Sequence, residues 1–444
     1  MKRLSIFCDL MLAVTLITLS FSVEAQNFTV TDLGLLPGGT YSFSTSINNQ
    51  GKVVGEADTS TGEFHAFLWD SVGGMQDLGT LAGRTFSSAN DINNLGQVVG
   101  SSFTNQNDVH PFLWDNGLMI DLGTLAGNTG FAQSINDTEQ VVGGAQTIDG
   151  VFHAFLWNAG TMQSLPTLPG GIVITLPGGM SRGAAFGINS VGQIVGWSTT
   201  VDGKRHAVLW EPPTYTPIDL GILPGTISSL AIGINDTGKV VGFALIDESS
   251  TFQSFRAFIW DSLVGMQPLG LLPGGSGSAA SDINNSDQVV GEADTTGGFF
   301  RGFILSVGVM QDLGIPLGGT YSLAESINES GQIAGEGDTV IGETHAVIWT
   351  PVSLSPQQQI GILTTNVETL VTTGILNQGQ GNALTSKLEA AISMLNKSNE
   401  NTAINQLQAF INQIEALIMG GILPVNEGQS LIEAANNIIN LITG

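Results

Sequence analysis

The sequence predicts an all-β, seven-bladed β-propeller followed by a small all-α domain. Three observations support this prediction. A pattern of Ile-Asn, a turn and a Val-Val-Gly-like strand occurs seven times, the copies start 43 to 53 residues apart, and residues 355–444 replace the pattern with helical periodicity. Periods of about 40 to 50 residues with four short strands are typical of propeller blades, because one β-meander cannot bury both of its faces alone.

Residues 1–25 have the features of an export signal. Lys2 and Arg3 give a positive start, residues 10–23 are almost entirely apolar, and Val23-Glu24-Ala25 places small residues where a signal peptidase cleaves. The apolar run is too short to cross roughly 30 Å of hydrocarbon. We therefore expect an exported protein, extracellular, on the cell surface or periplasmic, whose mature chain starts at Gln26 and has no membrane span.

Acidic residues dominate the charge of the chain. There are 12 Lys and Arg against 38 Asp and Glu, so the net charge is −26. Nucleic-acid binding depends on clustered basic side chains, and that class of partner is excluded. Hydrophobic residues make up 42% of the chain and charged residues 11%, which is the balance of a packed globular protein. The sole cysteine, Cys8, lies in the export signal, so cysteine chemistry is excluded in the mature chain.

Each repeat contains the same succession of strands. The Val-Val-Gly-like strand is followed by a strand such as residues 65–69, His-Ala-Phe-Leu-Trp, and then by an Asp-Leu-Gly-like strand. The isoleucines that mark the copies are Ile47, Ile92, Ile135, Ile188, Ile234, Ile283 and Ile327. Seven such repeats predict a ring of blades over residues 26–354.

The two ends of the repeat array predict how the ring closes. The first Asp-Leu-Gly strand, at Asp32, precedes the first repeat, and none follows Trp349. A strand near residues 30–34 is therefore expected to complete the last blade beside residues 345–349, which removes open sheet edges. Two prolines in residues 350–357 mark the end of the domain.

The segments that follow the seven isoleucines are interpreted as tight hairpin turns. Asn48-Asn49-Gln50-Gly51 and its cognates carry Asn or Asp early and usually Gly late. A calcium-loop interpretation of residues 91–96 lacks the distal glutamate of an EF-hand. A phosphate-loop interpretation of residues 233–239 has Val240 where Ser or Thr is required.

One repeat position holds all five histidines of the chain, and arginine occupies it in two repeats. Hairpin geometry predicts that a glutamate nine residues earlier faces this position in three repeats. The predicted pairs are Glu56 with His65, Glu292 with Arg301, and Glu336 with His345. We interpret them as structural pairs copied by duplication, each contributing roughly 0.2–1 kcal/mol.

Two sectors of the ring are expected to differ in chemistry. The first, sixth and seventh repeats alone carry Glu-x-Asp in the second strand, as Glu56/Asp58, Glu292/Asp294 and Glu336/Asp338. This acidic sector is a candidate site for a cation such as Ca²⁺. Trp197 and Phe243, at the glutamate position of the fourth and fifth repeats, are candidates for stacking on a sugar or anchoring a protein. The alternatives are that the glutamates are neutralised by His and Arg, and that both aromatic residues pack between blades.

The repeat resembles the HAF-type extracellular repeat family, named for the His-Ala-Phe that stands at residues 65–67 and 153–155. The resemblance covers about residues 29–350, and variants such as His110-Pro111-Phe112 depart from the motif. It implies an exported bacterial repeat protein and no particular reaction, so no catalytic residue is carried over.

Residues 355–444 are expected to form a separate helical domain. Apolar periodicity predicts helices over residues 357–373, 377–397, 402–419 and 427–442, which suit a four-helix bundle. The runs Asn-Gln-Gly-Gln-Gly-Asn-Ala-Leu at 377–384 and Lys-Leu-Glu-Ala-Ala at 387–391 resemble the FIMAH module, with similarity over about residues 358–442. The resemblance implies an accessory role in attachment or assembly, and a spacer bundle is the alternative.

The sequence contains no catalytic set of the GxSxG, HExxH or sialidase Asp-box kind. We therefore expect a binding or interaction scaffold rather than an enzyme. A glycan or a surface protein is the expected partner. The alternatives are a carbohydrate-active hydrolase or lyase on a propeller scaffold, and a purely structural component of the cell envelope.

Overall fold

The computed structural model describes residues 27–443 apart from 82–83, 105, 107, 177, 248–251, 307 and 353. The expected export signal lies outside these residues. The chain divides into two compact units, the first spanning Gln26–Val352 and the second containing residues 353–444. Each unit is described by itself.

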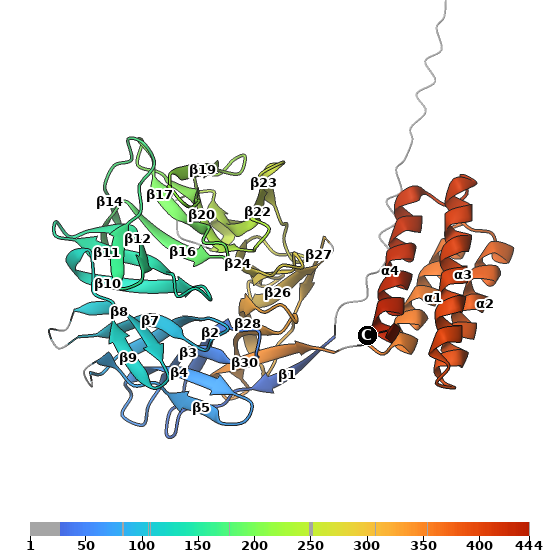
Figure 1. Ribbon diagram of the computed structural model, residues 1–444, viewed down its shortest axis with the longest axis horizontal. Coiled ribbons are helices and arrows are strands. Elements are labelled where there is room, and N and C mark those ends of the chain that lie inside the picture. The colour runs from blue at the N-terminus through green and yellow to red at the C-terminus, as the bar shows by residue number, and fades with distance from the viewer. Residues whose placement is uncertain are drawn as a thin grey trace, which may run out of the picture. The chain divides into compact units, whose positions relative to one another are not determined.

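The first unit is mainly β, and its antiparallel meanders surround a common centre, as is typical of a β-propeller (Figure 1). Among the described residues, five sheets have four strands each. The first three are β2 (Ser42–Ile47), β3 (Val53–Asp58), β4 (Phe64–Asp70) and β5 (Gly74–Asp77); β16 (Gly183–Ile188), β17 (Ile194–Thr199), β18 (Arg205–Trp210) and β19 (Pro217–Gly221); and β20 (Ser228–Ile234), β21 (Val240–Leu245), β22 (Phe255–Asp261) and β23 (Gly265–Pro268). The other two are β24 (Ser278–Ile283), β25 (Val289–Asp294), β26 (Phe300–Ser306) and β27 (Val309–Asp312); and β28 (Gly318–Ile327), β29 (Ile333–Thr339), β30 (Thr344–Pro351) and β1 (Phe28–Asp32).

A further sheet combines two meanders and an extra hairpin. The meanders are β6 (Ser87–Ile92), β7 (Val98–Phe103), β8 (Val109–Asp115) and β9 (Leu118–Asp121), and β10 (Ala126–Ile135), β11 (Val141–Thr147), β12 (Val151–Asn158) and β13 (Thr161–Ser164). A single parallel pair, Thr129 with Val109, joins them. The hairpin of β14 (Ile174–Leu176) and β15 (Gly179–Ser181) pairs with β12 and accounts for the longest repeat spacing.

The glycine of each Val-Val-Gly motif is required by a bulge in the first strand of the same sheet. The register of β2 against β3 shifts between Ser44 and Ser46, which brings the backbone of β2 close to Gly55. A Cβ at Gly55 would lie 2.0 Å from the carbonyl oxygen of Phe43. The cognate glycines meet the same obstacle at 2.0–2.1 Å, so only glycine fits this position.

The N-terminal strand completes the last sheet. β1 pairs antiparallel with β30, with Phe28 opposite Pro351 and Asp32 opposite Val347. The last sheet also packs against the first, since β2 contacts β29 and the Ser44 hydroxyl donates to the Gly335 carbonyl at 2.7 Å. The predicted position of the N-terminal strand is therefore confirmed.

The core of the β unit lies between adjacent sheets. The phenylalanine of the His-Ala-Phe motif is fully buried at Phe67 and Phe155, as is the cognate Phe303, and Trp210 and Trp349 are fully buried at the ends of their strands. In one interface, the side chains of Val54 and Leu68 pack with those of Ile92, Val98 and Phe112 from the next sheet. Each sheet thus buries its face only in the presence of a neighbour.

The second unit contains four helices within the described residues, as predicted: α1 (Pro356–Thr372), α2 (Gln378–Leu395), α3 (Glu400–Met419) and α4 (Val425–Thr443). Ser355 and Asn377 cap α1 and α2 through capping boxes with Gln358 and Gln380. The core includes Leu363, Leu388, Phe410 and Ile414. None of the helices described for the chain combines the length and the apolar character that crossing a membrane requires.

Removal of the N-terminal strand tests its role in closing the last sheet. A mature chain that lacks residues 26–39 should melt at a lower temperature and aggregate more readily, because the edge of β30 would lose its partner. Thermal unfolding followed by light scattering measures both effects. The exposed substitution Val72→Ser serves as the control, and equal melting of the truncated and intact chains would contradict the closure model.

Candidate functional site

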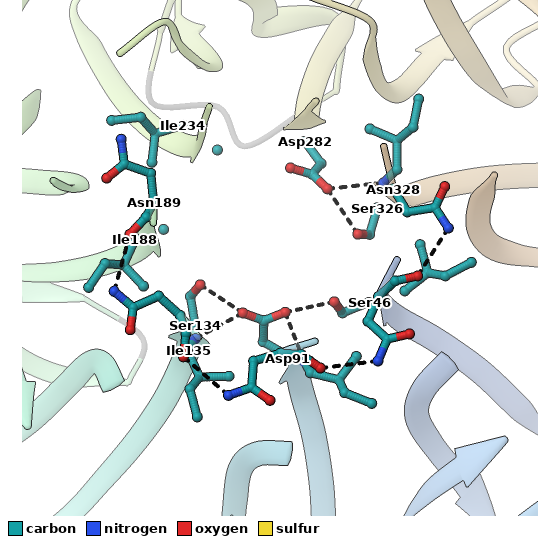
Figure 2. A pocket seen from close by; sticks show the side chains of 18 of the residues that line it. Ser46, Asp91, Ser134, Ile135, Ile188, Asn189, Ile234, Asp282, Ser326 and Asn328 are labelled. Atoms are coloured by element: carbon teal, nitrogen blue, oxygen red, sulfur yellow. Dashed lines mark hydrogen bonds between the residues drawn. The ribbon is translucent and has the colours of Figure 1, made fainter. Parts of the chain in front are cut away.

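Asparagine side chains tie the inner strands of the β unit to one another around its centre (Figure 2). The Nδ2 of each donates to the backbone carbonyl of the cognate asparagine in the next repeat, at 3.0–3.2 Å. Within the described chain this cycle has seven members: Asn48, Asn93, Asn136, Asn189, Asn235, Asn284 and Asn328. The last step, from Asn328 to Asn48, joins the two ends of the array.

The same asparagines also shape their own hairpins. The Oδ1 of Asn48 accepts the backbone amides of Gln50 and Lys52, both at 3.0 Å. Each asparagine of the cycle is at most 5% exposed, and both ends of its amide group are therefore used. The interpretation as turn formers was right, and the contact with the next repeat is what sequence reasoning missed.

A second set of hydrogen bonds, more exposed than the asparagine cycle, joins residues that directly follow the asparagines of the cycle. The Asn49 amide donates to Asn94 Oδ1 at 2.9 Å, and the Asn94 amide donates to Asp137 Oδ1 at 2.8 Å. Likewise the Glu329 amide donates to Asn49 Oδ1 at 2.9 Å. These bonds fix the polar rim of the central opening.

The asparagine cycle surrounds a cavity of about 650 Å³. Six carboxylate side chains line it, and no Lys, Arg or His of the described residues does. The carboxylates are Asp91, Asp137, Asp236, Asp282, Glu325 and Glu329. Phe186 and Ile232 form an apolar part of the wall at the repeat position that holds Ser281 and Glu325 elsewhere. The cavity is therefore polar and negatively charged, with one apolar arc.

Asp91 bridges three repeats on the cavity wall. Its Oδ1 accepts the Ser46 hydroxyl at 2.7 Å and the Ile92 amide at 2.8 Å. Its Oδ2 accepts the Ser134 hydroxyl at 2.7 Å and the Ile135 amide at 2.9 Å. The carboxylate is thus held by strands on both sides of its own.

Asp282 occupies the same repeat position on another part of the wall, and Figure 2 shows both carboxyl groups beside the opening. Its Oδ2 accepts the Ser326 hydroxyl at 2.9 Å and the Ile327 amide at 3.0 Å, while its Oδ1 accepts the Ile283 amide at 2.8 Å. The preceding repeat has Gly233 at this position. Desolvation, with a contribution from the charge of Asp91, raises the pKa of Asp282 to about 6.

Three glutamates from two neighbouring sheets interact with one another through their charges. Desolvation and the charges of Glu292 and Glu336 raise the pKa of Glu325 to about 8. Desolvation also raises the pKa of Glu292 and of Glu336 to about 7. The Tyr321 hydroxyl donates to Glu336 Oε1 at 3.3 Å. The structure thus brings two of the predicted glutamates together and adds Glu325, which has no equivalent in the other repeats.

The aspartates of the predicted acidic sector serve a different purpose. The carboxylate of Asp58 accepts the amides of Thr40 and Tyr41 at 2.7 Å and the Thr40 hydroxyl at 2.9 Å. Asp294 receives the same bonds from Ser276 and Gly277, directly before β24, and Asp338 receives them from Thr320 and Tyr321, in the first part of β28. These three carboxylates anchor the chain where it enters a sheet.

The predicted pairing of Glu56, Glu292 and Glu336 with His65, Arg301 and His345 is wrong. In the observed register Ala57 lies opposite His65, while Glu56 lies opposite Ala66, so the two side chains are on different faces of the sheet. The Nδ1 of His65 instead lies 2.9 Å from Asp77, and that of His345 lies 3.0 Å from Asp32. In the sixth repeat, the Nε of Arg301 lies 4.0 Å from the Oδ2 of Asp312, which occupies the position equivalent to Asp77. In five repeats the aspartate of the Asp-Leu-Gly-like strand is therefore the partner of this position, and in the third repeat Ser164 lies beside His153 instead.

The two candidate stacking residues lie in an apolar cluster. Trp197 is 4% exposed and packs with Ala184, Leu230 and Leu245. Phe243 is half-buried and stacks on Phe255, with ring centroids 4.9 Å apart. The geometry favours the alternative in which both residues pack between sheets. Among the described residues no group of three or more His, Cys, Asp or Glu side chains is arranged to hold a metal ion.

Comparison with known proteins assigns the helical unit. Residues 360–440 match the FIMAH domain, as the sequence predicted. Residues 179–299 match the family described as protein of unknown function DUF3466. No curated protein matches this chain by sequence.

Several solved structures are similar in fold. One is a prolyl endopeptidase, at 10% identity and a TM-score of 0.47, with 72% of this chain and 51% of that chain covered. Another is TolB from Acinetobacter baumannii, at 11% identity and a TM-score of 0.38, covering 67% and 80%. A third is the six-bladed β-propeller lectin from Aleuria aurantia, at 11% identity and a TM-score of 0.31, covering 66% and 97%. At these identities the similarity concerns the fold alone.

Replacing one asparagine of the cycle separates its two roles. Asn48→Asp keeps the acceptor for the turn amides but removes the donor to the Asn93 carbonyl, which then keeps only its bond from the Gly96 amide, and it adds a charge at a buried position. We expect a loss of about 1–3 kcal/mol in the free energy of unfolding, measured with urea. Asn49→Asp is the matched control, because the bond that Asn49 accepts from Glu329 survives. Equal stability of the two variants would refute an essential role for the cycle.

The glutamates near the cavity predict that the β unit loses stability as pH rises. Their pKa values are about 7 to 8 in the folded chain against about 4.5 in the unfolded chain. The folded state therefore binds more protons between these values, and its advantage disappears as pH rises through 7 to 8. Hydrogen bonding to aspartate raises the pKa of His65 and His206, which acts in the same direction.

Calorimetric melting from pH 5 to 8.5 measures this loss. Glu325→Gln should be more stable than the natural chain at pH 8.5, by on the order of 1–2 kcal/mol, because one pKa unit corresponds to about 1.4 kcal/mol and water in the cavity screens part of it. The exposed substitution Glu389→Gln is the control. A melting temperature that rises over this pH range would contradict the prediction.

Proposed function

We propose that this chain is an exported binding scaffold whose central cavity holds the end of a glycan. In this proposal residues 26–354 form a seven-bladed β-propeller of HAF-type repeats, and the FIMAH domain has an accessory role. The observation that carries the proposal is a cavity walled by carboxylates, amides and hydroxyls, with an apolar arc and without a basic side chain among its described residues.

The asparagine cycle supports the number of blades. Each of its members belongs to one repeat, and each donates to the next repeat until Asn328 returns to Asn48. β1 pairs with the outer edge of β30, so the N-terminal strand is the fourth strand of the last sheet. With this strand counted, each of the seven repeats corresponds to a four-stranded meander. These two observations support a closed ring of seven four-stranded blades.

The size and chemistry of the cavity support a sugar ligand. Sites for small molecules commonly enclose about 300–1,000 Å³, and this cavity falls within that range. Side-chain oxygens and amides supply donors and acceptors for hydroxyl groups, while Phe186 gives an apolar surface for a ring. Since the charged groups in the wall are carboxylates, neutral or amino glycans are favoured over uronates and sulfated glycans.

A carbohydrate-active enzyme is the second candidate. It is supported by the raised pKa of Asp282, since a general acid needs a carboxyl that stays protonated near neutral pH. Against it, Asp282 accepts three hydrogen bonds and Asp91 accepts four, in each case one from the next residue of its own strand and the others from strands of neighbouring repeats. Such bonds stabilise the ionised form and hold each carboxylate in a structural position.

A glycan array probed with the mature chain tests the proposed function. We expect signals from neutral and amino oligosaccharides and none from oligouronates. Ser281→Phe should weaken binding of the positive glycans about tenfold or more, because it fills the cavity with a side chain that the fourth repeat accommodates as Phe186. Ser281→Ala is the matched control and should retain binding.

Three results would count against the proposal. Binding that is equal for Ser281→Phe and the natural chain would place the glycan outside the cavity. The absence of any glycan signal would favour a structural role in the envelope. Release of shortened sugars from a positive glycan, measured by chromatography, would favour the enzyme.

A further inference from the structure

The FIMAH domain of this chain consists of two copies of one helical hairpin. An offset of 47 residues superimposes α3 and α4 on α1 and α2 in sequence, and the buried positions correspond. The buried pairs are Ile360 and Leu407, Leu363 and Phe410, Val367 and Ile414, Leu370 and Leu417, Leu376 and Leu423, Leu384 and Leu431, and Ala391 and Ile438. Both hairpins thus present the same stripe to one core.

The turns inside the two hairpins are built alike. Each contains Gly-Ile-Leu, with the glycine at a φ of 79° for Gly374 and 65° for Gly421. The Leu376 amide donates to the Leu370 carbonyl at 3.0 Å, and the Leu423 amide donates to the Leu417 carbonyl at 3.2 Å. The four helices alternate in direction, so both turns lie at the same end of the bundle (Figure 1). The α1–α2 turn therefore serves as an internal reference for the α3–α4 turn.

The two turns differ in how they satisfy their polar groups. In the first, Asn377 and Gln380 bond reciprocally, each side chain accepting the backbone amide of the other at 2.9 Å. The equivalent positions in the second turn are Pro424 and Glu427. Proline has no N–H to donate. Glu427 is 8% exposed, and its Oε2 is shielded from water and has no hydrogen-bond partner.

The second turn also exposes apolar side chains where the first is polar. Met419 is 82% exposed and Val425 is 69% exposed, and their counterparts are Thr372 and Gln378. Ile422 beside them is 43% exposed. The bundle folds with polar residues at these positions in its other half, so the apolar residues at the α3–α4 turn are not required by the fold.

We propose that the α3–α4 turn is a docking surface for a peptide segment that presents a Lys or Arg side chain flanked by large apolar side chains. The exposed Met419, Ile422 and Val425 bury the flanking side chains, and the cationic group pairs with the Glu427 carboxylate. Charge complementarity determines this choice, because residues 355–444 contain six glutamates and two lysines. A buried carboxylate oxygen without a donor destabilises the free domain, and a cation that reaches it removes this cost.

The mature full-length chain and a set of synthetic peptides test this surface. The peptides carry Leu-Ala-x-Ala-Leu with Arg, Lys, norleucine or Glu at the central position, and binding is measured by fluorescence anisotropy. We expect the Arg and Lys peptides to bind about tenfold or more tightly than the norleucine peptide, and the Glu peptide to bind least. Glu427→Gln should abolish this preference for a cation.

Counterpart substitutions provide the control for folding. Met419→Thr with Val425→Gln introduces the residues of the first turn at exposed positions and should weaken binding of all four peptides. Gln378→Val at the first turn should leave binding unchanged. An Arg preference that survives Glu427→Gln, or equal binding of the Arg and Glu peptides by the natural chain, would overturn the proposal. Helical circular dichroism of each variant confirms that the bundle is intact.

Discussion

The β unit depends on one interaction made repeatedly, the bond from an asparagine side-chain amide to the backbone carbonyl of the next asparagine. Each of these residues lies at the first turn of its repeat and is buried. Its oxygen closes the turn and its nitrogen reaches the neighbouring repeat, so the shape of a hairpin and the placement of the next one are coupled through one side chain. Because the bonds form a closed cycle, the first and last repeats are held together independently of the N-terminal strand.

This cycle explains why the cavity is polar. The residues beside the asparagines face the central opening, where they cannot be covered by an adjacent sheet, and serine, aspartate and asparagine occupy many of these positions. Asp91 and Asp282 also connect repeats, since each accepts hydrogen bonds from a strand of another repeat. The negative charge of the cavity therefore comes in part from carboxylates that hold neighbouring repeats together. Glu325 is different, because the structure gives it charged neighbours and it occupies a position that is Ser, Thr, Asn, Gln, Phe or Ile in the other repeats.

Duplication followed by local divergence describes both units of the chain. In the β unit, the position of Ser281 and Glu325 carries Phe186 and Ile232 in other repeats, which gives the cavity an apolar arc without altering the strand. In the helical unit, the two hairpins share a core and differ at one turn. Residues that the fold requires, such as the glycine at each bulge, stay the same in every copy. Positions that differ between copies include Ser281 and Glu325 in the cavity wall and Met419 and Val425 at the α3–α4 turn, where other copies show that the fold accepts other side chains.

The amino-acid sequence by itself determined the class of the fold, the order of its repeats, the N-terminal strand beside the last repeat and the four helices of the FIMAH domain. These properties follow from local periodicity and from the spacing of identical residues, which are visible along the chain. The tertiary structure alone decided which polar groups meet. A one-residue difference in register moves a side chain to the other face of a sheet, so His65 pairs with Asp77 and not with Glu56. No local pattern specifies the contacts between repeats: each bond of the asparagine cycle joins residues at least 43 positions apart, and Glu325 interacts with Glu292 from another sheet.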